Sequence, residues 1–126
     1  MPVHRASPRG KSSKLQKIAV AALEDIKARD ISVLDVRELT SLYDTLIVAT
    51  AESSRQVKAL SEHVREALKA AGANIIGVEG EQSGEWVLVD AGDIVVHIMQ
   101  PATRAYYNLE ELWTPPGARR RSKTAA

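Results

Sequence analysis

A continuous apolar run followed by a well-marked helix most limits the folds open to this chain. Residues 45–50, Thr-Leu-Ile-Val-Ala-Thr, have strand length, and such runs are typical of strands covered on both faces. Ser53 and Gln56 then have the spacing of a capping box, and apolar residues recur in steps of three and four over Val57–Leu68 until Gly72 supplies a C-terminal stop. A buried strand followed by an amphipathic helix favours an α/β fold.

The same two periodicities predict the other elements. Ser13 and Gln16 have the spacing of a second capping box, and Ala91-Gly92 allows a tight hairpin turn. In chain order we expect a helix over 13–28, strands over 31–36 and 45–50, a helix from 53 to Gly72, strands over 74–79, 85–90 and 93–99, and a helix over 103–113 that stops at Pro115-Pro116. This order predicts an α/β sandwich with a mixed five-stranded sheet and flanking helices.

Length and charge together predict one domain between two basic arms. With 126 residues the chain suits a single core, which we place at residues 13–114, with disordered basic segments at 1–12 and 115–126. Residues 1–13 and 114–126 hold seven bases and no acid, whereas the remaining ten bases face all 16 acids, a formal charge of −6. Basic arms can bind phosphate groups, and an acidic body favours a basic protein surface. A ribonucleoprotein offers both kinds of partner. The alternative is that the arms only solubilise the ends of the chain.

Several classes of protein are disfavoured. The chain has no 18-residue apolar run and no signal-peptide pattern at its N-terminus, so we expect a cytoplasmic protein. The absence of cysteine removes disulfides, thiolate catalysis and cysteine-ligated zinc. The positions of His4, His63 and His97 do not suggest a metal site, and we expect no cofactor.

Catalytic patterns are also missing. The sequence has no phosphate-binding loop, no dinucleotide fingerprint and no nucleophile elbow. Asp90 and Asp93 bracket the expected hairpin turn and could hold magnesium, but aspartate at turn ends has the simpler explanation of bonding to nearby backbone amides. The favoured interpretation is therefore a protein that is not an enzyme.

Trp86 is the residue that most suggests a binding surface. By alternation it shares a strand face with Leu88 and Asp90, and His97 can lie beside it on the next strand. Burial in the core and exposure as an anchor for a basic partner are both open. On the expected last helix, Tyr106, Leu109 and Trp113 fall on one stripe, which packing on the sheet would explain.

Five segments in register resemble the ribosomal silencing factor family, also called Iojap-like, from about Leu15 to Trp113. They are residues 53–57 (SSRQV), 78–80 (VEG), 84–90 (GEWVLVD), 92–99 (GDIVVHIM) and 104–113 (RAYYNLEELW). The resemblance implies a fold related to nucleotidyltransferases without their catalytic set, and a free protein that is monomeric or a homodimer. It also implies an anti-association factor and repressor of translation. Such a factor binds ribosomal protein L-fourteen (uL-fourteen) of the large subunit and blocks an inter-subunit bridge and the small subunit.

The resemblance also implies a docking surface. Its expected residues are Glu79, Trp86, Asp90, Asp93, His97, Met99, Arg104, Tyr107 and Glu110. Among them the aromatic side chains and Met99 would be desolvated anchors, the four acids would meet basic side chains of the partner, and Arg104 and His97 would orient their neighbours. The sequence departs from the family pattern at Thr45 and at Met99, where many members have an apolar residue and Phe.

Two further hypotheses stand beside this one. Outside the family core, Arg119, Arg120, Arg121 and Lys123 form a basic cluster that we expect to contact ribosomal RNA. The alternative function is a divergent magnesium-dependent nucleotidyltransferase that uses Asp90 and Asp93, although the Gly-Ser pair and Asp-x-Asp motif expected of it are missing. A general adaptor that recruits free RNA is disfavoured by the acidic core.

Overall fold

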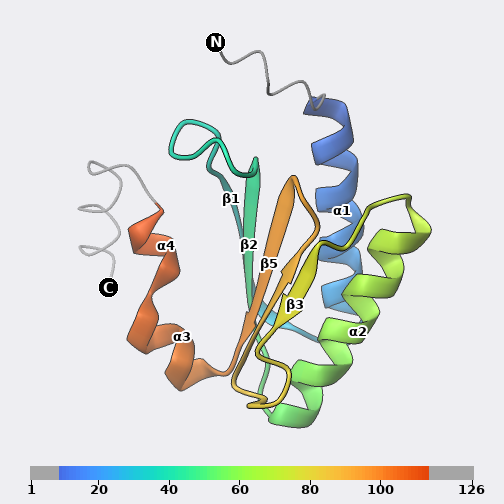
Figure 1. Ribbon diagram of the computed structural model, residues 1–126. Coiled ribbons are helices and arrows are strands. Elements are labelled where there is room, and N and C mark those ends of the chain that lie inside the picture. The colour runs from blue at the N-terminus through green and yellow to red at the C-terminus, as the bar shows by residue number, and fades with distance from the viewer. Residues whose placement is uncertain (1–8, 114–126) are drawn as a thin grey trace.

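The computed structural model describes residues 9–113 and consists of a five-stranded sheet with helices on both faces (Figure 1). Its elements are α1 (Arg9–Asp25), β1 (Arg29–Asp35), β2 (Thr45–Thr50), α2 (Ser54–Ala70), β3 (Gly77–Glu79), β4 (Trp86–Asp90), β5 (Ile94–Met99), α3 (Pro101–Tyr107) and α4 (Leu109–Leu112). The strand order is β1-β2-β5-β4-β3, in which β2 and β5 are parallel and all other neighbours are antiparallel. The predicted mixed five-stranded α/β sheet is confirmed.

The two central strands carry the core. Every residue of β2 and of β5 is buried, as the continuous apolar runs predicted. Helices α1 and α2 cover one face of the sheet, where Leu23 and Leu60 pack with Ile47, Val89 and Ile98. Each of these five side chains is fully buried, which contributes about 1.5–3 kcal/mol apiece to stability.

Helix α2 has the predicted caps. The Gln56 backbone N–H donates to Ser53 Oγ at 3.1 Å, and the Gln56 side chain accepts from the Glu52 backbone N–H at 2.7 Å. The Gln56 amide also donates to the Ile26 carbonyl at 2.9 Å, so the start of α2 is fixed against the end of α1. Gly72, with φ of 95°, follows the C-cap in the left-handed region that favours glycine.

The opposite face of the sheet is only partly covered. Leu109 and Trp113, from the C-terminal helices, pack on a second, smaller cluster that includes Leu46, Val48 and Val95. These helices are tied to the β1 edge, because Ser32 Oγ donates to Glu110 at 2.6 Å. The β4 side of this face is more open: Trp86, Leu88 and Asp90 are half-buried while their partners on β5 are buried.

Two predicted boundaries, the start of the first helix and the start of the third strand, are wrong. Helix α1 begins at Arg9, inside the expected arm, so Ser13 lies within the helix and does not cap it. The expected strand over 74–79 is reduced to its last three residues, the only ones that pair with β4. The remaining parts of the expected arms, 1–8 and 115–126, lie outside the described residues.

The expected last helix is two helices. Asn108 adopts a left-handed conformation, φ 45° and ψ 58°, which asparagine tolerates better than most residues, and ends α3. This break rotates the following residues, so the predicted stripe is wrong: Leu109 and Trp113 pack on the sheet, whereas Tyr106 is 81% exposed. Within residues 9–113 no helix has the length and apolar character needed to span a membrane.

Candidate protein-binding groove

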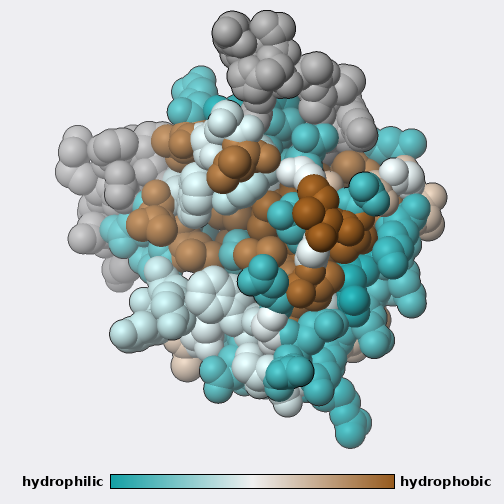
Figure 2. Space-filling model, in the orientation of Figure 1, coloured by the Kyte–Doolittle hydropathy of each residue, from teal (hydrophilic) through white to brown (hydrophobic). Residues whose placement is uncertain are grey.

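A groove lies between α3 and the exposed ends of β3 and β4, and we call it the β4–α3 groove. Its main hollow, of about 400 Å³, is lined by Glu79, Gly80, Ser83, Glu85, Trp86, Leu88, Thr103 and Tyr107. A neighbouring hollow of about 650 Å³ shares Glu85, Thr103 and Tyr107 and extends along α3. Figure 2 shows apolar surface crossing this side of the molecule, bordered by hydrophilic side chains.

Trp86 is held in one orientation at the base of the groove. Its indole Nε1–H donates to Nδ1 of His97 at 2.8 Å, and the two ring centroids are 5.8 Å apart. On its other side the Tyr107 ring lies 4.7 Å away, centroid to centroid, and Tyr107 in turn contacts the edge of Tyr106 at 4.9 Å. Tyr107 is 51% exposed, so the stack continues from the sheet to the surface. A preoriented aromatic stack of this kind suits an anchor for a partner.

His97 supports this arrangement only when it is neutral. Burial lowers the pKa of His97 to about 4, so the imidazole is uncharged at physiological pH. Because Nδ1 accepts the bond from Trp86, the proton of the neutral ring lies on Nε2. His97 therefore positions Trp86.

The rim of the groove is acidic. Glu79 and Glu85 line its main hollow and both are exposed, and among residues 13–113 no lysine or arginine lines that hollow. Asp90, on the same sheet face, accepts from the Gly92 backbone N–H at 2.9 Å. Burial of the Tyr43 phenol raises its pKa, and the nearby Asp90 charge raises it further. The groove thus offers negative charge beside aromatic rings, which suits a basic side chain.

Asp90 bonds through its side chain within the hairpin turn, as predicted, whereas Asp93 bonds through its backbone carbonyl. That carbonyl accepts from the backbone N–H groups of Asp44 and Thr45 at 2.8 and 3.1 Å. Across the part of the chain that the structure describes, no group of three or more histidines and acids could hold a metal ion.

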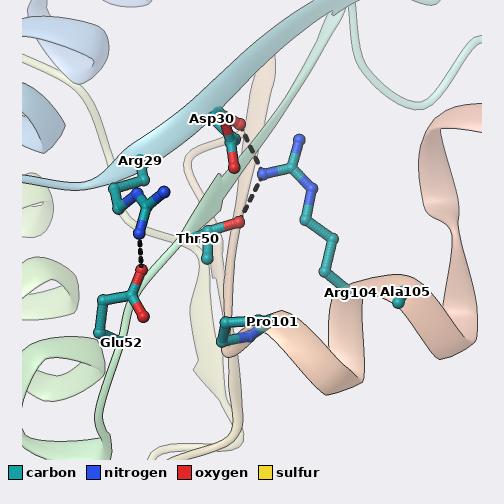
Figure 3. Close-up of a pocket in the computed structure, with 7 residues that line it drawn as sticks. All are labelled: Arg29, Asp30, Thr50, Glu52, Pro101, Arg104 and Ala105. Atoms are coloured by element: carbon teal, nitrogen blue, oxygen red, sulfur yellow. Dashed lines mark hydrogen bonds and ion pairs between the residues drawn. The ribbon is translucent and has the colours of Figure 1, made fainter.

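Arg104 faces a different hollow, of about 320 Å³, beside the ends of β1 and β2 (Figure 3). The Arg104 guanidinium donates to the Asp30 carbonyl, to Thr50 Oγ1 at 2.7 Å and to Glu110 Oε2 at 2.7 Å. Burial tends to raise the pKa of Glu110, but the bonds from Arg104 and Ser32 and the Arg104 charge outweigh burial and lower that pKa.

These contacts give Arg104 and Glu110 an internal role. The Arg104 side chain is 13% exposed, and with Glu110 it fastens α3 and α4 to the β1–β2 edge. Glu110 was expected to meet a basic partner, but its carboxylate is already engaged inside the protein. Arg104 holds Glu110 and Thr50 in place. The nearby pair of Arg29 and Glu52, 2.6 Å apart, is exposed and closes the other side of this hollow.

The structure sorts the nine expected docking residues into three groups. Glu79, Trp86 and Tyr107 meet in the groove, with His97 beneath Trp86 and Asp90 further along the same strand face. Met99 is fully buried next to Trp86, so its expected role as a surface anchor is wrong. The others, Asp93, Arg104 and Glu110, lie outside the groove lining.

Five residues that line the main hollow were missed by sequence reasoning: Gly80, Ser83, Glu85, Leu88 and Thr103. Leu88 was placed on the correct strand face, and alternation with Trp86 was the signal that could have identified it. Glu85 precedes Trp86 directly, so its acidic side chain could have been found as well. Thr103 reaches the groove only because α3 folds back across the sheet, and no local sequence pattern around Thr103 indicates that contact.

Fold and groove together define a small α/β domain with an aromatic, acid-rimmed binding surface on the open half of its sheet. A family model described as "Ribosomal silencing factor during starvation" matches residues 9–125. The chain therefore belongs to the ribosomal silencing factor family, as the resemblance predicted.

Individual relatives agree with this assignment. The ribosomal silencing factor of Chromobacterium violaceum is 59% identical over 100 residues, covering 79% of this chain and 82% of that protein. A crystal structure of a Chromobacterium violaceum protein is similar with a TM-score of 0.79 and 57% identity, covering 82% of this chain and 88% of that one. "Mitochondrial assembly of ribosomal large subunit protein 1" of Mus musculus is 33% identical over 98 residues, covering 75% of this chain and 43% of that protein.

Proposed function

We propose that this protein silences ribosomes by docking its β4–α3 groove on ribosomal protein L-fourteen of the large subunit. The bound protein would cover an inter-subunit bridge and exclude the small subunit, which represses translation. The observation that carries the proposal is the preoriented Trp86–Tyr107 stack beside Glu79 and Glu85, in a chain whose family is named for ribosomal silencing. The mouse relative, named for assembly of the ribosomal large subunit, supports the choice of subunit.

Charge and shape favour a basic protein as the partner. Exposed carboxylates repel the phosphates of RNA and attract lysine and arginine, which raises the rate of association and fixes the register of docking. A desolvated aromatic anchor adds affinity because Trp86 is already held by His97 and loses little freedom on binding. A stable complex of this kind buries roughly 1,200–2,000 Å² in total, more than the groove alone, so the surrounding face takes part.

A steric mechanism needs no catalysis, and we propose that the protein is not an enzyme and acts in the cytoplasm. The rival nucleotidyltransferase would need Asp90 and Asp93 as magnesium ligands, yet Asp90 bonds within its turn. Binding of a nucleoside triphosphate with magnesium, measured by calorimetry, would favour the rival. Contact between the residue 119–123 cluster and ribosomal RNA is the alternative to the role proposed for that segment below, and a homodimer of the free protein remains a separate prediction.

Sedimentation of purified subunits tests the proposal. Wild-type protein should sediment with large subunits and suppress the joined particle. Glu79→Lys and Tyr107→Ala should do both more weakly, and the loss of the anchor in Tyr107→Ala should lower the affinity for large subunits by about 10-fold or more. Glu66→Lys is the matched control, because Glu66 is an exposed acid on α2, on the covered face of the sheet. If wild type binds neither subunit, or if Glu66→Lys is as defective as Glu79→Lys, the proposal is wrong.

A further inference from the structure

The β4–α3 groove has a candidate ligand within the same chain. Residues 119–123, Arg-Arg-Arg-Ser-Lys, hold four of the chain's 17 basic residues, and no acid occurs from residue 114 onward. The described body to which this segment is joined is acidic, and the groove is lined by Glu79 and Glu85 with no lysine or arginine from residues 13–113. The segment and the groove are therefore complementary in charge.

The chain leaves the described structure on the side of the sheet where the groove opens. Trp113 is the last described residue, and its ring lies 5.8 Å from that of Tyr43, centroid to centroid. Tyr43 lies near Asp90, at one end of β4, and Trp86 is four residues along the same strand, about 13 Å away at the usual rise of a strand. Six residue steps separate Trp113 from Arg119, a reach of up to about 20 Å.

The chemistry of the groove suits a guanidinium group. Arginine stacks on tryptophan and tyrosine rings and pairs with carboxylates, and Trp86, Tyr107, Glu79 and Glu85 line one hollow. Among residues 13–113, Glu79 and Glu85 form no ion pair with a basic side chain, whereas Glu81 is paired with Arg65 at 2.8 Å. The two rim carboxylates thus remain available to a basic segment.

We propose that Arg119–Lys123 occupies the β4–α3 groove of its own chain and competes with the ribosomal partner, as an autoinhibitory segment. A tether of this length supplies an effective concentration of about millimolar, so even a weak contact leaves the groove covered much of the time. Coverage lowers the apparent affinity for the partner by the fraction of molecules whose groove is open. The segment's occupancy of the groove is independent of the ribosome, but its inhibitory meaning rests on the proposed function.

The first test observes the groove directly in the full-length protein. The Trp86 indole N–H is followed by NMR, assigned with Trp86→Phe, in wild type and in a variant with Arg119→Gln, Arg120→Gln and Arg121→Gln. The expected result is that this signal shifts in the variant and that about 1 M salt shifts wild type toward the variant position, since exposed ion pairs are screened. The control removes three exposed charges from the opposite side, Arg55→Gln, Lys58→Gln and Lys69→Gln on α2, and should leave the signal in place.

The second test measures affinity for purified large subunits at low salt. An autoinhibitory segment predicts that the triple-Gln variant of residues 119–121 binds about twofold to tenfold more tightly than wild type. Weaker binding by that variant would mean that the segment contacts the ribosome instead, and would overturn the inhibitory role.

Two NMR outcomes would overturn the contact within one chain. The first is an unchanged Trp86 signal in the triple-Gln variant. The second is a wild-type signal that moves to the variant position on dilution, because a contact between copies of the protein would then be responsible. If neither protein binds large subunits, the proposed function fails while the NMR result still decides whether the segment occupies the groove.

Discussion

Acid should destabilise this protein through His97. The pKa of His97 is about 4 in the folded protein and ordinarily 6.5, because burial disfavours the charged ring. Between these two pH values the unfolded chain binds more protons than the folded one, so stability is full above pH 6.5 and falls as the pH is lowered toward 4. The difference of about 2.5 pH units corresponds to about 3 kcal/mol, of which about 2.5 kcal/mol is lost by pH 4.5.

Urea unfolding followed by tryptophan fluorescence measures this loss at a series of pH values from 7.5 to 4.5. The comparison variant is His97→Gln, which keeps a side-chain acceptor for the Trp86 indole and removes the titration. The pH dependence of the free energy of unfolding should be larger in wild type than in His97→Gln by about 2.5 kcal/mol. Equal pH dependence in wild type and His97→Gln would refute the reasoning.

Three other substitutions have expected outcomes that chemical denaturation can measure. Gly80→Ala should lower the free energy of unfolding by about 2 kcal/mol or more and shift the Trp86 fluorescence, because Gly80 has φ of 89° and an added Cβ would overlap the Trp86 carbonyl oxygen. Gly77→Ala is the control, since the space around Gly77 is open, and it should lower the free energy of unfolding by less than about 1 kcal/mol. Ser61→Ala should leave the free energy of unfolding unchanged or raise it by up to about 1 kcal/mol, because within residues 13–113 the Ser61 hydroxyl is the one buried side-chain group without a hydrogen-bond partner. A decrease of about 1 kcal/mol or more in the free energy of unfolding would contradict this. Arg104→Lys should lower the free energy of unfolding by about 1–3 kcal/mol, because the lysine ammonium cannot reproduce the bonds of the guanidinium to Glu110, Thr50 and Asp30 together. A denaturation midpoint equal to that of wild type would rule out the fastening role of Arg104.

The central sheet and the setting of Trp86 could be predicted from sequence because they depend on local patterns. The unbroken apolar runs of β2 and β5 identify strands covered on both faces, and alternation places His97 on the same face as Trp86. The caps of α2 were equally visible, since Ser53 and Gln56 act within one turn.

The remaining features depend on contacts that no local pattern reports. Met99 is buried because Leu109 and Trp113 pack on its sheet face, and they do so only because Asn108 breaks the last helix. The bond between Arg104 and Ser32 joins residues 72 positions apart, so its partners cannot be inferred from spacing. For the same reason the groove, which needs α3 folded against β4, was anticipated in several of its residues and not in its shape.

Oxidative footprinting of the protein with and without purified large subunits tests the docking surface most directly. Wild-type protein bound to large subunits should show strong protection of Tyr107 and Trp86, which meet in the groove, and unchanged labelling of the exposed side of α2. Protection of α2 with unchanged labelling of Tyr107 and Trp86 would contradict docking through the β4–α3 groove.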